Sequence, residues 1–345
     1  MIRTPTARRV GIKTRTDING LSRVIAVAKD GSGQFTAIES ALAAVAAIAP
    51  DANDAISLVL AEDATWTLEV SEVPNNCNVY SASAIPANTV ISAATNNRGT
   101  GYASALFEIL GASIFEGFTL NSDASGGGTG FGTDAGHQGQ VTFDRLIIPN
   151  QGDDSFYLFG GGEYSINRCD VHVKFDGVAV FGSDVNQVVT VSNSYFHTDN
   201  TTATSKNMIR IDNSNAVVSV RGSKLVATAN SAVGGVHCIG SGLLGKNANT
   251  ADVSIIGSVI ECQHSGVGAA SDALYKNGGR LKITDSQLIT TGERVGTDYC
   301  LNLANVSDLE TGKGISSSTV AADTATTAQA QNDGGNNAVT GFKII

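Results

Sequence analysis

Apolar residues recur through the middle of the chain in short alternating stretches, each interrupted by one or two small or polar residues. Seven of these stretches read FEGFTL, FDRLII, INRCDV, VSNSYF, VRGSKL, IIGSVI and ITDSQL, and they begin at Phe115, Phe143, Ile166, Val191, Val220, Ile255 and Ile283. The starts are 23 to 35 residues apart. This spacing is too short for repeats with full helices and is typical of a coil with three short strands per turn. A β-sandwich, the alternative all-β fold, has a turn about every 8 to 12 residues and lacks this longer period.

The pattern predicts an all-β, single-stranded right-handed parallel β-helix in which alternate side chains point into a long, narrow core. Successive turns of such a coil stack about 4.8 Å apart, so that equivalent residues form ladders along its axis. We expect roughly nine or ten turns, with the Ser and Asn residues at the breaks forming ladders of this kind.

One amphipathic helix is predicted within residues 32–50. Its apolar positions, at helical spacing, are Phe35, Ile38, Leu42, Val45 and Ile48, and Pro50 ends it. Because the ends of a β-helix expose strand edges that need covering, we expect this helix to cap the N-terminal end of the coil.

Three regions are expected. Residues 1–24 form a basic N-terminal anchoring arm, residues 25–310 form the parallel β-helix, and residues 311–345 form a low-complexity C-terminal tail. The tail contains few large apolar residues before its final FKII, and we expect it to become ordered only against a partner or the surface of the coil.

Composition supports a folded protein without a disulfide framework. Hydrophobic residues make up 42% of the chain and charged residues 16%, a balance that is atypical of disordered chains. The five cysteines are odd in number and show no CxxC spacing, so we expect buried free thiols in place of disulfides or a zinc site. No cofactor and no metal are predicted.

Charge is distributed unevenly between the arm and the rest of the chain. Residues 1–24 contain six basic residues and one acid, a balance of +5, so the remainder carries −15 of the total of −10. Such a basic end is suited to an acidic protein surface, nucleic acid or membrane lipid, and a loose solubilising tail is the alternative. No apolar run follows the basic N-terminus, so a standard signal peptide and a membrane span are not expected.

The segment VIAVAKDGSGQFTAIESAL, residues 24–42, resembles the opening of pectinesterases, with a strand, a DGSG turn and a capping helix. Further segments follow that family in order: TLEV at 67–70, TVIS at 89–92, SALFEILGASIFEGFTL at 104–120, SKNMIRI at 205–211 and LLGK at 243–246. The resemblance covers roughly residues 24–262. It implies the β-helix fold of the pectate-lyase-like superfamily.

The resemblance also implies a catalytic pair. DDSFYL at 153–158 is similar to the family segment that carries a general acid/base, which makes Asp154 that residue, and DGVAVFG at 176–182 makes Asp176 the nucleophile. The two aspartates are 22 residues apart, close to one turn, so their carboxylates are expected to stack on one exposed face of the coil. Two carboxylates about 5 Å apart repel each other, which lets one remain protonated while the other attacks.

Two departures from the family pattern oppose ester hydrolysis. The family's glutamine beside the general acid is here Asp153, which adds negative charge where an oxyanion needs stabilising. Lys246 occupies the place of the family's arginine, and lysine lacks the bidentate fork that orients a carboxylate. Gln138 and Gln140 are the candidates for the upstream oxyanion glutamine. The sequence therefore predicts little or no pectin methylesterase activity.

Other interpretations of these residues stay open. Asp153, Asp154 and Asp176 are also a candidate calcium site, although no spaced loop motif supports one. A sugar-stacking surface and inward packing explain the neighbouring aromatic residues equally well, namely Tyr157, Phe159, Phe175 and Phe181. The histidines are interpreted as polar turn or face residues: His137, His172, His197, His237 and His264.

These observations favour a non-catalytic structural or adhesive β-helix of a bacteriophage-like virion, as a spike, fibre or decoration, with a decayed pectinesterase-like site. The alternative is a carbohydrate esterase that hydrolyses methyl esters of pectin-like polysaccharide. We expect the arm to bind other virion or assembly proteins, the body to meet a surface polysaccharide, and the location to be a virion or extracellular particle. We expect a homo-oligomer, and the resemblance implies a trimer. No membrane partner and no specific nucleic-acid partner are expected.

Overall fold

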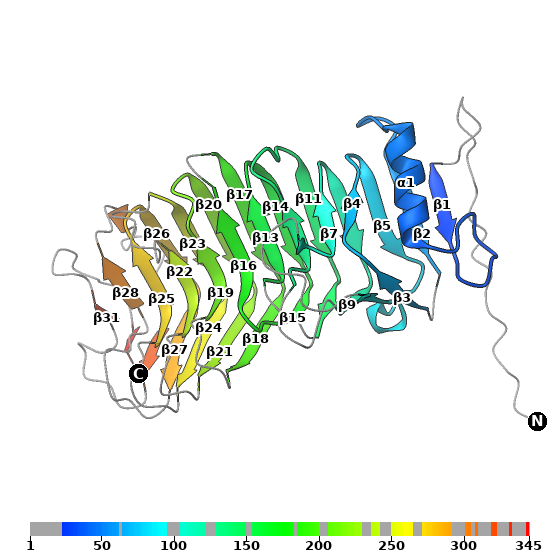
Figure 1. The fold of residues 1–345 in the computed structure, drawn as a ribbon. Helices are drawn as coiled ribbons and strands as arrows, with labels where there is room; N and C mark the ends of the chain where they lie inside the picture. Colours follow the sequence, from blue (N-terminus) through cyan, green and yellow to red (C-terminus); the bar gives the residue numbers. More distant parts are fainter. Residues whose placement is uncertain are drawn as a thin grey trace, which may run out of the picture.

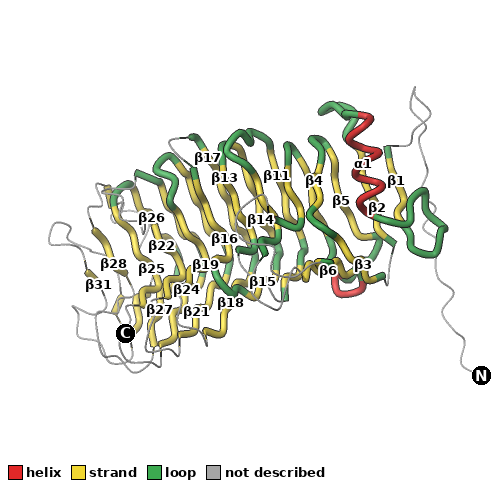
Figure 2. Tube along the Cα trace, viewed as in Figure 1, coloured by secondary structure: helices red, strands yellow, loops and turns green. Residues whose placement is uncertain are grey.

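The computed structural model of the chain describes residues 23–61, 64–94, 104–121, 128–149, 154–182, 185–200, 206–229, 236–241, 250–264, 271–291, 301–304, 308–309, 319–322, 331–332 and 343–344. These residues form an elongated coil of parallel strands with one α-helix at its N-terminal end (Figure 1). The strands lie in three long sheets that run the length of the coil (Figure 2). The predicted parallel β-helix with an N-terminal capping helix is therefore confirmed.

Sheet 1 has eleven strands, and each strand pairs with the strand one turn further along the chain. In spatial order they are β1 (Val24–Val27), β2 (Ile56–Leu60), β5 (Cys77–Ser81), β8 (Ser113–Glu116), β11 (Gln140–Asp144), β14 (Gly162–Asn167), β17 (Gln187–Ser192), β20 (Ala216–Arg221), β23 (Asp252–Ile256), β26 (Arg280–Thr284) and β29 (Asp308–Leu309).

Sheet 2 has ten strands in the same parallel arrangement. They are β4 (Ser71–Val73), β7 (Phe107–Ile109), β10 (Phe131–Thr133), β13 (Phe156–Phe159), β16 (Asp176–Phe181), β19 (Lys206–Ile211), β22 (Val236–Ser241), β25 (Ser271–Asn277), β28 (Leu301–Ala304) and β31 (Gln331–Asn332).

Sheet 3 has eleven strands and completes each turn. They are β3 (Thr65–Leu68), β6 (Val90–Ala93), β9 (Thr119–Asn121), β12 (Ile147–Ile148), β15 (Asp170–His172), β18 (Tyr195–Asn200), β21 (Lys224–Ala229), β24 (Val259–His264), β27 (Gln287–Thr291), β30 (Thr319–Ala322) and β32 (Lys343–Ile344). A short 3-10 helix, η1 (Pro86–Asn88), precedes β6.

The seven repeats found in the sequence coincide with the turns of the coil. Their first residues are direct cross-strand partners in sheet 1, in the order Phe115, Phe143, Ile166, Val191, Val220, Ile255 and Ile283. All seven side chains are fully buried. The alternation in the sequence therefore identified both the period of the coil and the residues that face its core.

The breaks in the repeats are the bends between sheets 1 and 3. At each break one residue has a positive φ near 50° to 80°, as in Gly117, Asn193, Gly222 and Gly257. Behind these residues a serine ladder runs along the axis. The hydroxyl of Ser194 accepts a hydrogen bond from the Cys169 N–H, and the same bond repeats from Ser194 to Ser223, from Ser223 to Ser258 and from Ser258 to Ser286. The expected ladder at the breaks is therefore present.

The helix α1 (Ile38–Ile48) begins later than the predicted range but buries the predicted face. Ile38, Leu42 and Val45 are buried, and Phe35 and Ile48 pack partly buried against the same core. Phe35 lies before the helix, where it forms a bridge with Val27 of β1. The left-handed Ala49 ends the helix, with its N–H donating to the Val45 carbonyl.

Three short strands, β30, β31 and β32, fall within residues 311–345, the region expected to form a tail. They pair with β27, β28 and β30 and so extend sheets 2 and 3. The open edge at the end of a parallel coil accepts even a short stretch, including the polar Gln331–Asn332 of β31, because its backbone groups need partners. The coil therefore receives strands from beyond residue 310.

Four cysteines are free and buried in the described part of the chain, namely Cys77, Cys169, Cys238 and Cys262. Burial raises the pKa of the Cys77 thiol to about 12, which leaves it a poor nucleophile. Cys300 lies outside the described residues. In the part of the chain that the structure describes, no helix has the length and hydropathy needed to cross a membrane.

Candidate functional site

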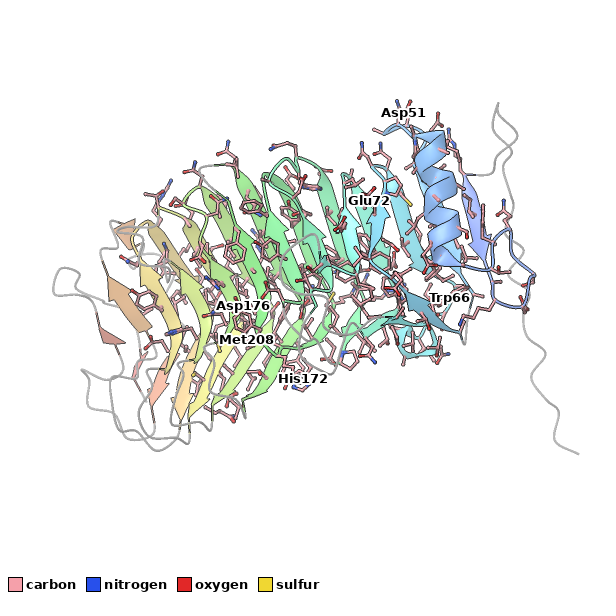
Figure 3. The ribbon with its side chains drawn as sticks, in the orientation of Figure 1. Asp51, Trp66, Glu72, His172, Asp176 and Met208 are labelled. Atoms are coloured by element: carbon pink, nitrogen blue, oxygen red, sulfur yellow. The ribbon has the colours of Figure 1, made fainter. Side chains whose placement is uncertain are left out.

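A row of polar side chains follows sheet 2 in the middle of the coil, one from each successive turn. Asp176 pairs with Asn207, Asn207 with His237, and His237 with Asp272. Asp154 precedes them by one turn, because Phe156 pairs with Val178 and the Ser155 N–H donates to the Asp176 carbonyl. The ladder along the axis is thus Asp154, Asp176, Asn207, His237 and Asp272, and Figure 3 shows Asp176 midway along the coil.

An irregularity in the strands turns this row to the outer face of sheet 2. Strand pairing skips the residue that follows each polar position, at Met208, Cys238 and Ala273. In β19, Met208 and Ile209 are consecutive and both fully buried, which breaks the alternation of a regular strand. The same residue is skipped on both strands, so the register is kept. Asn207 and Arg210 both contact Asp176 and so lie on the same side of the sheet.

Asp176 is held by donors on both of its oxygens. The Asn207 backbone N–H and side-chain Nδ2 donate to Oδ1 at 3.1 and 2.8 Å, and Arg210 Nη1 donates to Oδ2 at 3.3 Å. The residue is 1% exposed. Burial raises the pKa of Asp176 above its ordinary value, against the opposing effects of Asn207 and Arg210.

Arg210 connects the polar row to a second carboxylate and to an aromatic surface. Its Nε donates to Asp212 Oδ2 at 2.6 Å, and its guanidinium carbon lies 5.0 Å from the centre of the Phe181 ring. The side chain is 17% exposed. The arginine therefore neutralises two buried carboxylates while part of it faces solvent.

Half-buried aromatic side chains flank Arg210 on the outer face of sheet 2. The ring centre of Tyr157 lies 5.0 Å from that of Phe181 and 6.3 Å from that of Phe159. All three are partly exposed, and Phe175 is partly exposed as well. The two interpretations of these aromatic residues were a sugar-stacking surface and inward packing. Their outward orientation is compatible with stacking on a sugar ring.

Of the six side chains named from the sequence, the structure brings Asp154 and Asp176 together on successive turns. Gln140 begins β11 in sheet 1 and donates through Nε2 to Glu163 Oε2 at 2.9 Å, and Gln138 is exposed in the loop before it. Neither glutamine belongs to the polar row of sheet 2. Asp153 and Lys246 lie outside the described residues.

The structure also adds residues that the sequence did not single out, above all Arg210, Asn207 and Asp212. Arg210 lies in SKNMIRI, a segment that carried the resemblance without any role attached to it. The spacing in the sequence was one available signal. Arg210 follows Asp176 by 34 residues, about one turn with an insertion, and this spacing places the arginine beside the aspartate. His237 joins the row with Nδ1 3.2 Å from Asp272 Oδ2.

The other described histidines lie elsewhere. His137 is buried in the connection between β10 and β11, where it contacts the Tyr164 hydroxyl at 2.9 Å. His172 and His197 stack with ring centres 4.8 Å apart on sheet 3. Among the residues that the structure describes, no group of three or more His, Cys, Asp or Glu side chains is arranged to hold a metal ion.

Comparisons with protein-family models and with curated proteins find no match. Among solved structures, the chain is similar to a pectin methylesterase from carrot, with 15% identity, a TM-score of 0.45, and coverage of 93% of this chain and 88% of that one. The pectin methylesterase PemA from Erwinia chrysanthemi gives 11% identity, a TM-score of 0.47, and coverage of 71% and 80%. The A-module of the mannuronan C-5 epimerase AlgE6 from Azotobacter vinelandii gives 13% identity, a TM-score of 0.45, and coverage of 89% of this chain and 94% of that one. At these identities and TM-scores the similarities carry no conclusion about the activity of this chain.

Proposed function

We propose that the protein is a glycan-binding β-helix of a bacteriophage-like virion, with a pectinesterase-like polar row that does not hydrolyse esters. The observation that carries the proposal is the state of Asp176. Its carboxylate is 1% exposed and accepts three hydrogen bonds from Asn207 and Arg210. An ionised carboxylate has about four lone-pair sites, so three are occupied here. Burial closes the remaining one to a substrate, which a nucleophile has to reach.

The surface above Asp176 supports binding to sugars. Tyr157 and Phe181 offer partly exposed aromatic faces, and Arg210, whose guanidinium lies over the Phe181 ring, offers N–H donors for hydroxyl or carbonyl oxygens. Partly exposed aromatic rings beside a few polar groups are suited to a pyranose, which has apolar faces and polar edges.

Charge along sheet 2 favours a neutral or methyl-esterified glycan over a polyanion. Seven carboxylates lie on or beside its outer face, at Glu72, Glu108, Asp134, Asp154, Asp176, Asp212 and Asp272. Arg210 compensates Asp176 and Asp212. Because like charges repel across an interface, removing the methyl groups of a pectin-like chain should weaken its binding.

Binding is tested by affinity electrophoresis in gels with highly methylated pectin, de-esterified pectin or a neutral glucan. The Tyr157→Ala, Phe181→Ala double variant should lose about tenfold in affinity, the order expected for two aromatic contacts. Val217→Ala, an exposed change on sheet 1, is the control. Equal retardation of the double variant and the natural protein, or binding that strengthens on de-esterification, would refute this site.

A second function, hydrolysis of methyl esters, is favoured by one observation. Arg210 supplies beside Asp176 the guanidinium that Lys246 was expected to replace. In this function Asp176 attacks the ester carbonyl carbon, Asp154 protonates the departing methanol, and water then cleaves the acyl-enzyme.

Methanol release from methylated pectin separates the two functions. We expect the natural protein to release no methanol above background. Release by the natural protein that disappears in Asp176→Ala would establish the esterase and reject the non-catalytic site.

The virion location is supported by the basic residues 1–24 and by the stacked architecture of the body. Mass spectrometry of purified particles should detect the chain, and deletion of residues 2–23 should abolish its incorporation. Incorporation unchanged by the deletion would show that the arm is not the anchor.

A further inference from the structure

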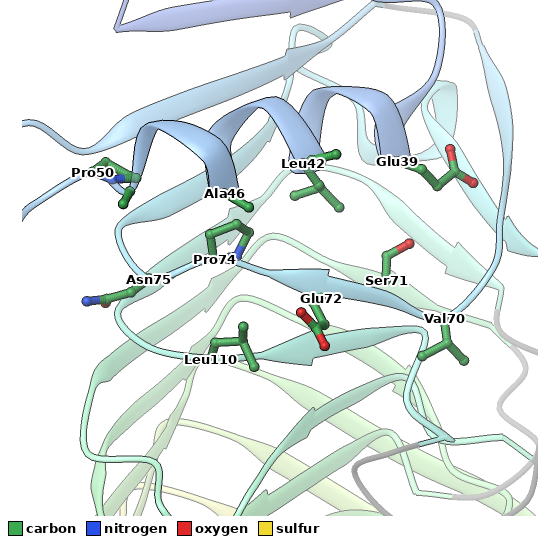
Figure 4. A pocket seen from close by; sticks show the side chains of 12 residues that line it. Glu39, Leu42, Ala46, Pro50, Val70, Ser71, Glu72, Pro74, Asn75 and Leu110 are labelled. Carbon is green, nitrogen blue, oxygen red and sulfur yellow. The ribbon is translucent and has the colours of Figure 1, made fainter.

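A groove of about 970 Å³ lies between α1 and the outer face of sheet 2, away from the polar row. Figure 4 shows the helix along one side and the chain around β4 and β7 along the other. The small, exposed Ala43 and Ala46 form the helix wall, while Val70 and Leu110, 38% and 52% exposed, form the opposite wall. Exposed large apolar side chains facing a row of alanines leave room for the side chains of a docked segment.

The same groove carries negative charge. Glu39 of α1 and Glu72 of β4 line it, and no lysine or arginine does so in the part of the chain that the structure describes. Glu72 is the cross-strand partner of Glu108. Burial and the charge of Glu72 raise the pKa of Glu108. A cationic occupant would relieve this repulsion.

The chain itself contains a segment with the complementary chemistry. Residues 1–22 contain five basic residues and one acid, a balance of +4. In the central stretch ARRVGIKTR, the apolar Val10 and Ile12 lie between basic residues. This segment lies outside the described residues.

The junction of that segment with the coil lies near the groove. The first described residue, Arg23, forms an ion pair with Asp54. Asp54 belongs to the turn that begins at Asp51, directly after Pro50, which lines one end of the groove. Residues 1–22 have a reach of up to about 70 Å, against a length of about 16 Å for α1. The segment is thus tethered close to a groove that it can span.

We propose that the groove between α1 and β4 is the docking site of the basic segment 1–22 of the same chain. Val10 and Ile12 pack against Leu110 and the alanines of α1, and the neighbouring arginines face Glu39 and Glu72. Tethering supplies an effective concentration in the millimolar range, so a modest intrinsic affinity suffices. Docking would keep the segment on the coil until a more strongly acidic surface competes for it. The proposal is independent of glycan binding.

Limited trypsin digestion of the full chain tests the docking, because trypsin cleaves after Arg8, Arg9, Lys13 and Arg15. The rate of cleavage follows the undocked fraction when opening is fast. Glu39→Lys, Glu72→Lys should raise the rate roughly tenfold, and Ala46→Trp, which fills the groove without changing charge, should do the same. Raising the salt concentration should accelerate cleavage of the natural protein, since exposed charges are screened.

Glu163→Lys, a single charge reversal of the same kind at an exposed position of sheet 1, is the control and should leave the rate unchanged. Circular dichroism of each variant checks that the coil is folded. Cleavage of the natural protein as fast as a free peptide of residues 1–22 would overturn the proposal. So would protection that disappears on dilution, because that result would assign the groove to the segment of a second copy.

Discussion

Gly177, directly after Asp176, occupies a position without room for a side chain. A Cβ there would lie 2.5 Å from the Met208 carbonyl oxygen and 2.9 Å from both Phe196 Cδ1 and Val173 Cγ2. The carbonyl belongs to the backbone of the next turn and cannot move away alone. The close approach of this turn to the next therefore depends on this glycine.

Gly177→Ala should lower the free energy of unfolding by about 1–3 kcal/mol, the usual cost of overpacking. Urea denaturation followed by circular dichroism measures this change. Gly257→Asn is the matched control, because Gly257 has a φ of +56° with no atom within 4 Å, and Asn193 adopts a φ of 50° in the equivalent bend. It should cost about 1 kcal/mol or less. An equal loss in both variants would contradict the close approach at Gly177.

Lys276 is a fully buried lysine on β25. Its ammonium donates to the Gly278 carbonyl, and burial lowers its pKa to about 8 despite the opposing charge of Asp252. The unfolded chain, with an ordinary lysine pKa, binds the proton more readily than the folded one. Between pH 8 and about 10.5 folding therefore releases a proton, and this residue makes stability rise with pH in that window.

Lys276→Met should raise stability at pH 7 and remove the rise between pH 8 and 10.5. A shift of this size corresponds to roughly 3 kcal/mol between the two ends of the window. Urea midpoints at pH 7 and pH 10 for both proteins measure the effect. A natural protein whose stability falls over this window, relative to the variant, would show that the lysine is stabilised as a cation.

At the scale of elements, the bends were predictable and the polar row was only partly so. Each repeat contains its own signal, two apolar alternations around a small or polar residue, and Val191 and Val220 accordingly lie in register. In NMIR, residues 207–210, the same alternation would place Asn207 on the same inward face as the buried Ile209. The structure departs from this alternation at Met208, where strand pairing is interrupted, and no local feature of the sequence marks that interruption.

Arg210 was not predicted, for a related reason. The length of a turn varies from 22 residues between Asp154 and Asp176 to 35 between His237 and Asp272. Spacing alone therefore does not tell which turn a distant residue joins. Register along sheet 2, which the structure supplies, places Arg210 one turn after Asp176.

The serine ladder of the bends gives a prediction at this scale. Ser223 Oγ accepts from the Ser194 N–H at 3.2 Å and donates to the Arg221 carbonyl at 3.0 Å. Ser223→Ala leaves a buried N–H without its acceptor, which should cost about 1–3 kcal/mol in urea denaturation. Ser165→Ala, on the half-buried outer side of β14, should change stability by less than about 0.5 kcal/mol. Equal effects would mean that the ladder contributes nothing specific.

At the scale of the whole molecule, the core is a line of layers in which each turn touches its neighbours. Aromatic side chains fill the layers near the N-terminal half. Phe131 stacks on Phe107 and on Phe156 with ring centres 5.6 Å apart on each side, and its edge meets Phe115 and Phe143 at 5.0 and 4.8 Å. Stability in such a solenoid is close to a sum of turns and nearest-neighbour interfaces, so damage to one layer should stay local.

Phe131→Ala, which empties a fully buried position, should cost about 3–5 kcal/mol. Hydrogen–deuterium exchange should then show loss of protection in β7, β10 and β13, while β23 and β26, four or more turns away, keep the protection of the natural protein. Val217→Ala, an exposed change on β20, controls for handling and should leave all strands unchanged. Loss of protection spread evenly from β7 to β26 would show that the coil opens as a single cooperative unit, and the nearest-neighbour description would then fail for this protein.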